Sequence, residues 1–363
     1  MVSLSVVLIS RNQAWNVSRL IESVLERTDW VDAREIILVD SASSDTTAQI
    51  ACEYNIDVLQ LDERQRLSAA AGRFVGTSNG RHEYILFLDG DMELCESGLR
   101  RMVHVLDDKP EAAAICGRIV DRPLPATPEE RSSFKTPQGE QSIVRVKSMR
   151  GATLIRRAAL EAVGGFDPYL YSDEEPELAI RLRQAGYELW SIDDALAWHY
   201  TAPSREISTV IGRWQRNLYC GAGQILRRHL GTSLFWTCVR ERGYGLVPAA
   251  LAALGVATAA YSIITFTAHW FLAWLLGVAA LVFALALRRR SLKAAVRKIL
   301  QRLFILDGTI RGFLMPLPPR DAYPTRVRVL RRVSAARHAS VSDGARTTQS
   351  SSYDCEQPAS TRL

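Results

Sequence analysis

Short runs of large apolar residues alternate with segments of helical spacing along the first part of the chain. The runs are Leu4 to Ile9, Ile36 to Val39, Val58 to Leu61 and Tyr84 to Leu88. Continuous apolar runs of this length are typical of strands that are covered on both faces. Between the first two runs, apolar residues recur at the spacing of one helix face, at Leu20, Ile21, Val24 and Leu25. Strand, helix and strand at about 30-residue spacing predict right-handed crossovers and a doubly wound α/β sheet.

Polar residues follow the predicted strands directly. Ser10 and Arg11 follow the first, Asp40 closes the second, and Asp89-Gly90-Asp91 closes the Tyr84 strand. Ligands of open α/β sheets bind outside the carboxyl ends of such strands. Two carboxylates one residue apart need a cation or hydrogen bonds to neutralise them. The Asp-Gly-Asp motif therefore suits a divalent metal that also holds a diphosphate, although the same residues favour a solvated turn.

The spacing of glycines favours a mononucleotide over a dinucleotide. No Gly-x-Gly-x-x-Gly follows any of the predicted strands. Asp40 can accept hydrogen bonds from a base or ribose, while Arg11 and Arg73 can offset phosphate charge. The alternative for Asp40 is that it caps the next helix.

A second acidic cluster runs from Asp173 to Glu177. Pro176 suits the first turn of a helix, and Gly186 suits its end. Glu175 then lies at a helix N-terminus, where the dipole favours the ionised carboxylate, and can act as a general base. The alternative is that these acidic residues only stabilise the start of the helix. His199 follows the next predicted strand and is either structural or a metal ligand.

The order and spacing of these motifs resemble the family-2 inverting glycosyltransferases of the GT-A fold. The resemblance covers roughly residues 3 to 230. It rests on Ser10-Arg11-Asn12, Glu35 to Asp40, Ser43 to Thr47, Ala71-Gly72-Arg73, Gly76, Asp89-Gly90-Asp91, Gly151-Ala152, Gly164 to Asp167, Glu174 to Glu177 and Arg181 to Tyr187. The expected catalytic domain is an α/β GT-A domain, Rossmann-like with a mostly parallel sheet.

The resemblance implies a role for each of these positions. The donor site would be formed by Ser10, Arg11, Asp40, Arg73 and Asp89. The cofactor would be Mg²⁺ or Mn²⁺ on the donor phosphates, held by Asp89, Asp91 and His199.

The base that deprotonates the acceptor maps onto Glu175, next to Glu174. The family's usual aspartate is a glutamate here, so Glu174 or Glu177 remain alternatives. Arg213 and Trp214 match half of the Gln-x-x-Arg-Trp motif of processive members and are expected on the acceptor side. The missing Gln argues against a polymerising synthase. Phe74 stands where the family usually has Asn, which leaves that role vacant.

A long uncharged stretch follows the predicted catalytic domain. No Asp, Glu, Lys or Arg lies between Arg242 and Arg288, which is about twice the length of one membrane span. We expect two transmembrane helices, about 246–266 and 269–287, with basic residues at both ends that place both ends in the cytoplasm. The alternative is a buried helical hairpin of a soluble domain.

The expected domains are 1–232 for the catalytic domain, 233–290 for the membrane region, 291–330 for an amphipathic juxtamembrane segment and 331–363 for a disordered tail. The juxtamembrane segment places apolar residues on one face and basic ones on the remainder. This pattern is typical of a helix on an anionic leaflet or of a solvated surface helix. The residues 123–141 are expected to form a mobile loop over the acceptor site.

Composition narrows the class of protein. The 363 residues carry a net charge of +6, with much of the basic excess beside the apolar stretch and in the tail, so we expect lipid headgroups and no nucleic acid as partners. The six cysteines show neither metal nor disulfide spacing, which is typical of a reducing cytosol. The N-terminal apolar run is short and is interpreted as the first strand, with no signal peptide.

The sequence therefore predicts a metal-dependent inverting glycosyltransferase at the cell inner membrane, multi-pass, with its catalytic domain in the cytoplasm. Its partners would be a nucleotide-sugar donor and a lipid-linked or glycan acceptor in exopolysaccharide or cell-envelope assembly. One alternative is a polyprenyl-phosphate glycosyltransferase, whose acceptor needs no strong base. Another is a non-catalytic nucleotide-sugar-binding membrane scaffold. A nucleotidyltransferase is disfavoured, because no glycine-rich basic loop follows the first strand.

Overall fold

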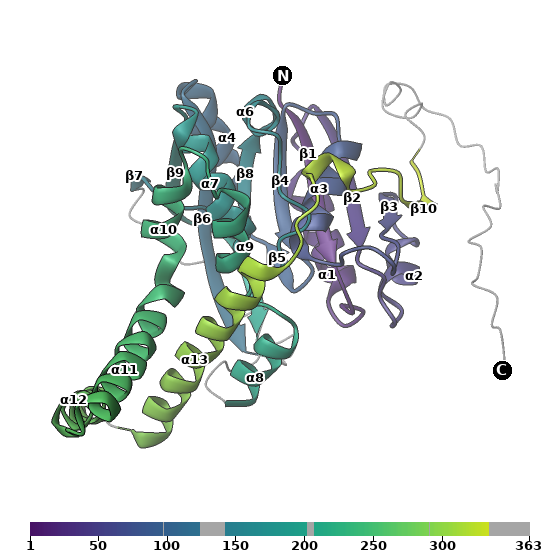
Figure 1. Cartoon of the computed structure of the whole chain (residues 1–363). Coiled ribbons are helices and arrows are strands. Elements are labelled where there is room, and N and C mark those ends of the chain that lie inside the picture. Colours follow the sequence, from purple (N-terminus) through teal and green to yellow (C-terminus); the bar gives the residue numbers. More distant parts are fainter. Residues whose placement is uncertain (97, 124–141, 202–206, 290, 334–363) are drawn as a thin grey trace, which may run out of the picture.

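A single mixed sheet with helices on both faces forms the body of the molecule, and an apolar helical hairpin projects from it (Figure 1). The computed structural model describes residues 1–96, 98–123, 142–201, 207–289 and 291–333. The strand order is β10-β3-β2-β1-β4-β8-β6-β9-β5, and β7 pairs with β9.

The parallel part of the sheet is the part that the apolar runs predict. Its strands are β1 (Ser3–Ser10), β2 (Ala33–Asp40), β3 (Asp57–Gln60) and β4 (Tyr84–Asp89), in the order β3-β2-β1-β4. The helices that connect them are α1 (Val17–Arg27), α2 (Thr47–Ala51) and α3 (Ala69–Asn79).

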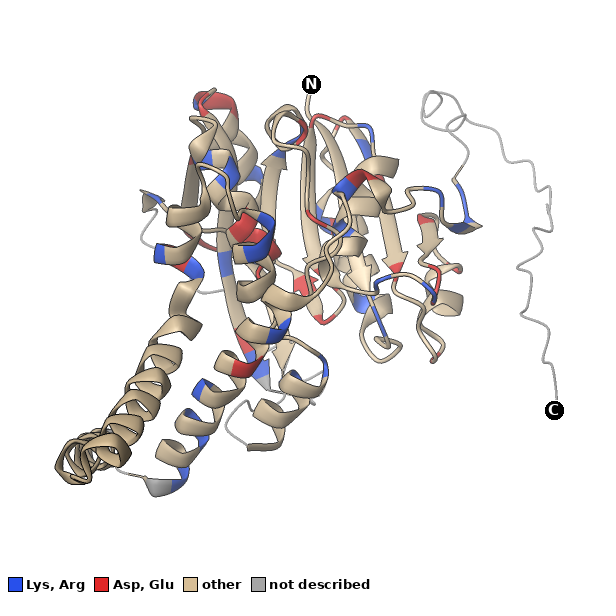
Figure 2. Cartoon of the chain, in the orientation of Figure 1, with Lys and Arg blue, Asp and Glu red and all other residues tan. Residues whose placement is uncertain are grey.

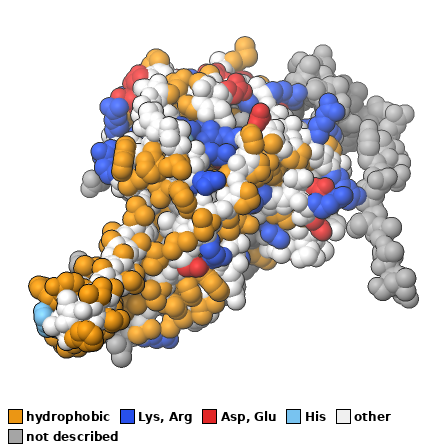
Figure 3. Space-filling model, in the orientation of Figure 1, with side chains coloured by type: hydrophobic (Ala, Val, Ile, Leu, Met, Phe, Trp, Pro, Cys, Tyr) orange, Lys and Arg blue, Asp and Glu red, His pale blue; other side chains and the backbone are white. Residues whose placement is uncertain are grey.

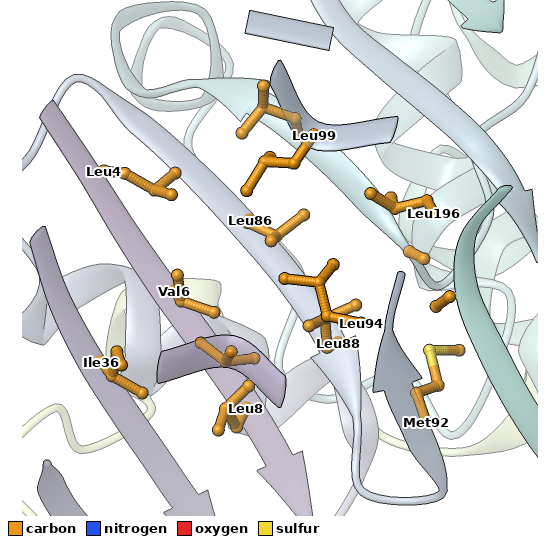
Figure 4. Close-up of a cluster of buried hydrophobic side chains, with 14 of the residues drawn as sticks. Leu4, Val6, Leu8, Ile36, Leu86, Leu88, Met92, Leu94, Leu99 and Leu196 are labelled. Carbon is orange, nitrogen blue, oxygen red and sulfur yellow. The ribbon is translucent and has the colours of Figure 1, made fainter. Parts of the chain in front are cut away.

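Both faces of this parallel block are buried. Leu4, Val6 and Leu8 of β1 pack with Leu86 and Leu88 of β4 on one face (Figure 4). The alternate β1 residues, Val7 and Ile9, belong to a second core cluster on the opposite face. Burial on both faces explains why each strand is a continuous apolar run and not an alternating one.

The expectation of a mostly parallel sheet is wrong for the half of the sheet that lies beyond β4. Among the described strands, four pairings are parallel and five are antiparallel. After β4 the chain runs through a short turn into β5, and the place beside β4 is filled later by the antiparallel β8. Without a long crossover between neighbours, strands in this half need not run parallel. These strands are β5 (Met92–Leu94), β6 (Ala112–Pro123), β7 (Ile143–Arg145), β8 (Thr153–Arg156) and β9 (Glu188–Thr201).

Helices complete the body and form the projection. Those of the body are α4 (Gly98–Asp108), α6 (Arg157–Ala162), α7 (Glu174–Gln184), α8 (Ile207–Gln215), α9 (Gly221–Arg228) and α10 (Phe235–Arg242). The short η1 (Gly243–Gly245) leads into the hairpin of α11 (Leu246–Thr265) and α12 (His269–Arg289), after which α13 (Leu292–Leu314) returns to the body.

The two apolar helices lie where the sequence predicts them. The continuous helical stretch Phe235–Thr265, which includes α10, η1 and α11, is long and apolar enough to cross a membrane. The apolar segment His269–Ala284 of α12 is shorter. Only 6% of the apolar window of the longer helix is buried, so it is not a core helix of the described body. The projection is covered by hydrophobic side chains (Figure 3) and is free of acidic and basic ones until its end (Figure 2).

Helix α13 is docked on the body through glycines. A Cβ on Gly223 of α9 would lie 1.9 Å from the Thr309 carbonyl oxygen, and one on Gly312 would lie 2.1 Å from that of Cys220. Such distances leave no room for a side chain at either glycine. The C-terminal half of α13 is therefore part of the body, whereas the sequence predicted a helix on the membrane surface or a solvated surface helix.

The chain after α13 crosses back over the body. Tyr323, which follows η2 (Arg320–Ala322), is 2% exposed, and its hydroxyl donates to the Arg66 carbonyl at 2.7 Å. Strand β10 (Arg328–Arg331) then pairs antiparallel with β3. The sequence did not predict this strand, because four residues with arginines at both ends carry too little pattern. Residues 334–363 of the expected disordered tail and residues 124–141 of the expected mobile loop lie outside the described residues.

Candidate active site

A cavity of about 250 Å³ opens at the carboxyl ends of β1, β2 and β4. This edge is where an open α/β sheet binds ligands. The lining comes from four separate segments: Ile9 to Arg11 with Gln13, Ser41, Leu67 to Ala69, and Asp89 to Asp91. The structure thus brings Ser10, Arg11, Asp89 and Asp91 together as the sequence predicts.

The Asp-Gly-Asp turn is held from within the body. The buried Asn16 side chain donates to the carbonyls of Gly90 at 3.0 Å and Met92 at 2.9 Å. The Gly90 amide donates to the Ile9 carbonyl at 2.8 Å. These bonds fix both ends of the turn, so it is not the loose solvated turn of the alternative interpretation. Asn16 is a positioning residue that the sequence analysis missed.

Arg73 joins the two acidic clusters. Its guanidinium is 1% exposed and lies 2.9 Å from Asp89 Oδ1 and 2.9 Å from Glu175 Oε1, and it also pairs with Glu174. Burial works against its charge, but Glu175, Asp89 and Glu174 together raise the pKa of Arg73. Helix α3 presents Arg73 here, and Ser68 caps this helix by accepting from the Ala71 amide. The predicted donor-side arginine therefore lies between the Asp89 turn and the base candidates.

Glu174 and Glu175 begin α7 and differ in their environment. The Glu174 side chain is 6% exposed and the Glu175 side chain 18%. Burial, followed by the neighbouring Glu175 carboxylate, raises the pKa of Glu174 to about 8. A carboxyl that holds its proton near neutral pH is available as a base in only a fraction of the molecules. The more exposed Glu175 is the better placed of the two.

His199 lies between two carboxylates. Its Nε2 is 3.3 Å from Asp91 Oδ2, and its Nδ1 is 2.8 Å from Asp121 Oδ1 on β6. The hydrogen bond with Asp91 is the largest cause that raises the pKa of His199 to about 9. Asp121 was not among the predicted residues, because only the β6–β9 pairing brings it opposite His199.

A divalent metal fits the chemistry of this corner. Asp91 Oδ1 is buried and has no hydrogen-bond partner among the residues that the structure describes, which leaves a hard oxygen ligand in the cavity unused. Across the described part of the chain, no three His, Cys, Asp or Glu side chains are arranged as a complete metal site. Mg²⁺ held on substrate phosphates commonly takes only one or two carboxylates from the protein. The residues present therefore suit a metal that arrives with a diphosphate.

Asp40 lies beside the cavity but does not line it. It is fully buried, and its carboxylate accepts from the Ser43 amide at 2.9 Å, from the Ser43 hydroxyl and from Gln60 Nε2 at 3.0 Å. It does not cap α2, whose N-cap is Thr46. Ser10 does line the cavity, and its buried hydroxyl has no partner among the described residues.

Arg213 and Trp214 are not brought to the cavity lining. Trp214 stacks on Phe304 of α13 with ring centroids 5.0 Å apart, and its indole donates to Asp307 at 2.7 Å. Arg213 lies over the Tyr219 ring at 5.9 Å. Trp214 therefore docks α13, whereas Arg213 contacts Tyr219, and no pattern near residue 213 could indicate either contact.

Glu177 is also separate from the cavity. It is fully buried and pairs with Arg181 at 2.7 Å, His229 at 2.9 Å and Arg320 at 2.8 Å. Burial alone would raise its pKa, but the charge of Arg181, the hydrogen bond with His229 and the charge of Arg320 hold the pKa of Glu177 far below its usual range. Residues two positions apart on a helix do not face each other, so Glu177 points away from the side that Glu175 faces.

Glu177→Gln is expected to lower the free energy of unfolding by about 3–5 kcal/mol, because it leaves buried cations without their counter-ion. A carboxylate with a lowered folded pKa stabilises the protein fully above its unfolded pKa and loses that effect as the pH falls below it. The difference between wild type and variant should therefore be full at pH 7 and shrink below about pH 4. Thermal unfolding across this pH range measures it.

Glu161→Gln is the matched control. Glu161 pairs with Arg157 across the same i,i+4 spacing, but it is 62% exposed. An exposed pair contributes about 0–1 kcal/mol, so this variant should unfold like the wild type. Equal effects of the two substitutions would show that the Glu177 cluster does not stabilise the fold.

Residues 5–164 match the family model described as "Glycosyl transferase family 2". A curated relative, "Glycosyltransferase AglE" of Haloferax volcanii, is 28% identical over 230 residues, which are 61% of this chain and 72% of that protein. The "Poly-beta-1,6-N-acetyl-D-glucosamine synthase" of Staphylococcus epidermidis is 24% identical over 67% of this chain and 59% of its own length. The "Succinoglycan biosynthesis protein ExoA" of Rhizobium meliloti is 25% identical over 52% of this chain and 60% of its own length. The chain thus spans about three fifths of the latter two proteins.

Proposed function

The N-terminal part of this chain is a family-2 glycosyltransferase domain of the GT-A fold, and from this premise we propose that the protein transfers a sugar from a nucleotide-sugar donor to an acceptor hydroxyl, with inversion at the anomeric carbon. The observation that carries the proposal is the buried Arg73, which contacts Asp89 at the cavity and Glu174 and Glu175 at the start of α7. Three carboxylates converging on one buried cation are costly to assemble. A scaffold that only binds sugar nucleotides has no use for both acidic clusters.

The donor would bind along the cavity edge. Arg11 supplies positive charge there for a diphosphate, and the unpartnered Ser10 hydroxyl supplies a donor or acceptor. Asp40 would bind the nucleoside only if Ser43 or Gln60 gives up its bond to the carboxylate. Both terminal nitrogens of Arg73 are paired with carboxylates, so Arg73 would act on the diphosphate through Asp89.

Asp91 and Asp89 would hold Mg²⁺ or Mn²⁺ on the donor diphosphate, with His199 beside them. The bound ion neutralises charge that develops on the nucleoside diphosphate leaving group. Asp121 orients the imidazole of His199 through its Nδ1 bond, as carboxylates commonly do for histidines near metals. Arg73 holds Asp89 in place from the opposite side.

Glu175 would remove the proton from the acceptor hydroxyl. It lies at the N-terminus of α7, where the helix dipole favours the ionised carboxylate. Arg73 fixes its orientation at 2.9 Å, and Glu174 completes the shell around the guanidinium. The deprotonated hydroxyl oxygen then attacks the anomeric carbon opposite the leaving diphosphate, which inverts its configuration in one displacement.

The apolar hairpin supports an acceptor held at a membrane. Helix α11 exposes large apolar side chains such as Val247 and Ile263, and basic residues of α13 such as Lys293 and Arg302 follow the hairpin. This arrangement suits a multi-pass inner-membrane protein with the catalytic domain in the cytoplasm. The acceptor would be a lipid-linked or other glycan in polysaccharide or cell-envelope assembly, in keeping with the names of the relatives.

Hydrolysis of a panel of nucleotide sugars by detergent-purified full-length protein tests the proposal. We expect one donor to be cleaved slowly in Mg²⁺ or Mn²⁺ and not in EDTA, because water can replace the acceptor. If no donor is cleaved, thermal shift with each donor separates two outcomes. Metal-dependent binding would support the proposed donor site. Absence of both turnover and binding would contradict the proposed transferase function.

A further inference from the structure

The segment just before the base candidates is held from the foot of the apolar hairpin. Asp173 directly precedes α7 and has φ 64°, a left-handed conformation that is uncommon for a residue other than Gly. Its carboxylate does not cap α7. Instead it accepts from the Tyr244 hydroxyl at 2.8 Å and pairs with the Arg242 guanidinium. We call these three residues the Asp173 clamp.

The clamp connects two functional elements across the body. Arg242 ends α10 and Tyr244 lies in η1, and the apolar helix α11 begins two residues after Tyr244, at Leu246. On the other side, Asp173 is adjacent in sequence to Glu174, and its carbonyl accepts the Glu177 amide at 3.0 Å to start α7. The clamp therefore joins the first turn of the base helix to the first turn of the hairpin.

The residues before Asp173 are held from the same side. The Gln224 side chain of α9 accepts from the Tyr171 amide at 2.9 Å, and the Ser172 hydroxyl donates to the Leu218 carbonyl at 3.1 Å. A Cβ on Gly221 would lie 2.2 Å from the Ser172 carbonyl oxygen, so α9 lies directly against this loop. The loop thus has one packed arrangement, and the left-handed Asp173 is maintained by its surroundings.

We propose that Arg242 and Tyr244, acting through Asp173, are positioning residues that orient Glu174 and Glu175 from the foot of the apolar hairpin. This inference rests on the proposed function, because it assigns the two glutamates to the reaction. The clamp touches neither the cavity lining nor Arg73, so it acts through the backbone at the start of α7. Anchoring of α11 and placement of the base are then parts of one rigid arrangement.

Tyr244→Phe tests the clamp, because it removes one hydroxyl and keeps the ring. In the full-length protein we expect faster hydrogen exchange at the Glu177 amide, which reports the first turn of α7. We also expect kcat for the cleaved donor to fall by about tenfold or more with KM for the donor within about twofold, since a misplaced catalytic group costs rate and not ground-state binding. Arg242→Gln should act in the same direction.

Arg183→Gln is the matched control. It removes the other ion pair between α7 and α10, Arg183 with Glu241 at 2.7 Å, which lies away from the start of α7. We expect exchange at Glu177 and kcat to stay at the wild-type level in this variant. The inference is overturned if Tyr244→Phe and Arg242→Gln both leave exchange and kcat unchanged, or if Arg183→Gln changes them equally. Absence of both turnover and donor binding in the wild type would refute the proposed function, while the exchange result would still decide whether the clamp holds the first turn.

Discussion

Asp91→Asn is expected to reduce donor cleavage and sugar transfer by about a thousandfold, because several kcal/mol of charge stabilisation on the leaving group are lost. The substitution keeps the shape of the side chain but removes the hard anionic oxygen. In the structure, Asp91 Oδ1 is buried in the cavity corner without a partner, so no bond within the described residues holds it there. An unsatisfied buried carboxylate oxygen is costly to the fold and points to a ligand.

Stability separates this effect from misfolding. Burial and the nearby charges of Glu175 and Asp91 raise the pKa of Asp89, although Arg73 opposes them. Removing the Asp91 charge relieves part of this repulsion, so the melting temperature should stay within about 2 °C of wild type. Titration calorimetry of the cleaved donor should show metal-dependent tightening for wild type and none for Asp91→Asn.

Asp108→Asn is the control, because Asp108 is 62% exposed at the end of α4. The Asp108→Asn variant should cleave the donor at the wild-type rate. The metal role of Asp91 is refuted if Asp91→Asn keeps activity within about tenfold of wild type, or if EDTA leaves the wild type fully active.

Glu175→Gln is expected to slow transfer to a hydroxyl acceptor by about a hundredfold to ten-thousandfold, the usual contribution of a general base. The amide can still accept from Arg73 and so keeps the local packing. Donor affinity should change by less than about threefold, because the proposed role of Glu175 is on the acceptor and Glu175 does not line the cavity. Single-turnover transfer and donor calorimetry measure the two quantities separately.

Glu174→Gln is the informative comparison. Its carboxyl has a pKa raised to about 8 and already carries a proton for much of the time at neutral pH. Glu174→Gln should therefore lower the rate of transfer by about tenfold at most, which is well below the loss expected for Glu175→Gln. The opposite ranking would move the base to Glu174. Full activity of both variants would favour transfer to a phosphate, whose oxygen is already ionised and needs no base.

The sequence predicts the parallel block and the edge on which the site lies. Strands buried on both faces are continuous apolar runs, so the ends of β1, β2 and β4 are visible as the first polar residues after them. Glu174 and Glu175 were found in a similar way, because proline and acidic residues mark the first turn of a helix. These signals are local, and each is complete within about ten residues.

Part of what was missed could have been found from helix geometry. Once α7 is placed at Glu174, Glu175 and Glu177 are two positions apart and cannot share a face. This geometry separates Glu177 from Glu175 without any knowledge of its partners, although Glu174, three positions before Glu177, shares its face. Arg181 lies one helical turn after Glu177, and this spacing is the local signal for the ion pair between the two residues.

Only the tertiary structure decided which residues meet. Arg73 and Glu174 are 101 residues apart, and the contact depends on how α3 and α7 pack against the sheet. The docking of Trp214 on α13 and the pairing of β10 with β3 also join segments that carry no shared pattern. The sequence by itself determined the strands of the parallel block, the start of α7 and the apolar hairpin, because burial and capping leave a periodic or local mark. The Arg73 cluster, the mixed half of the sheet and the Asp173 clamp were decided by packing, because contacts between distant segments leave no such mark in a single sequence.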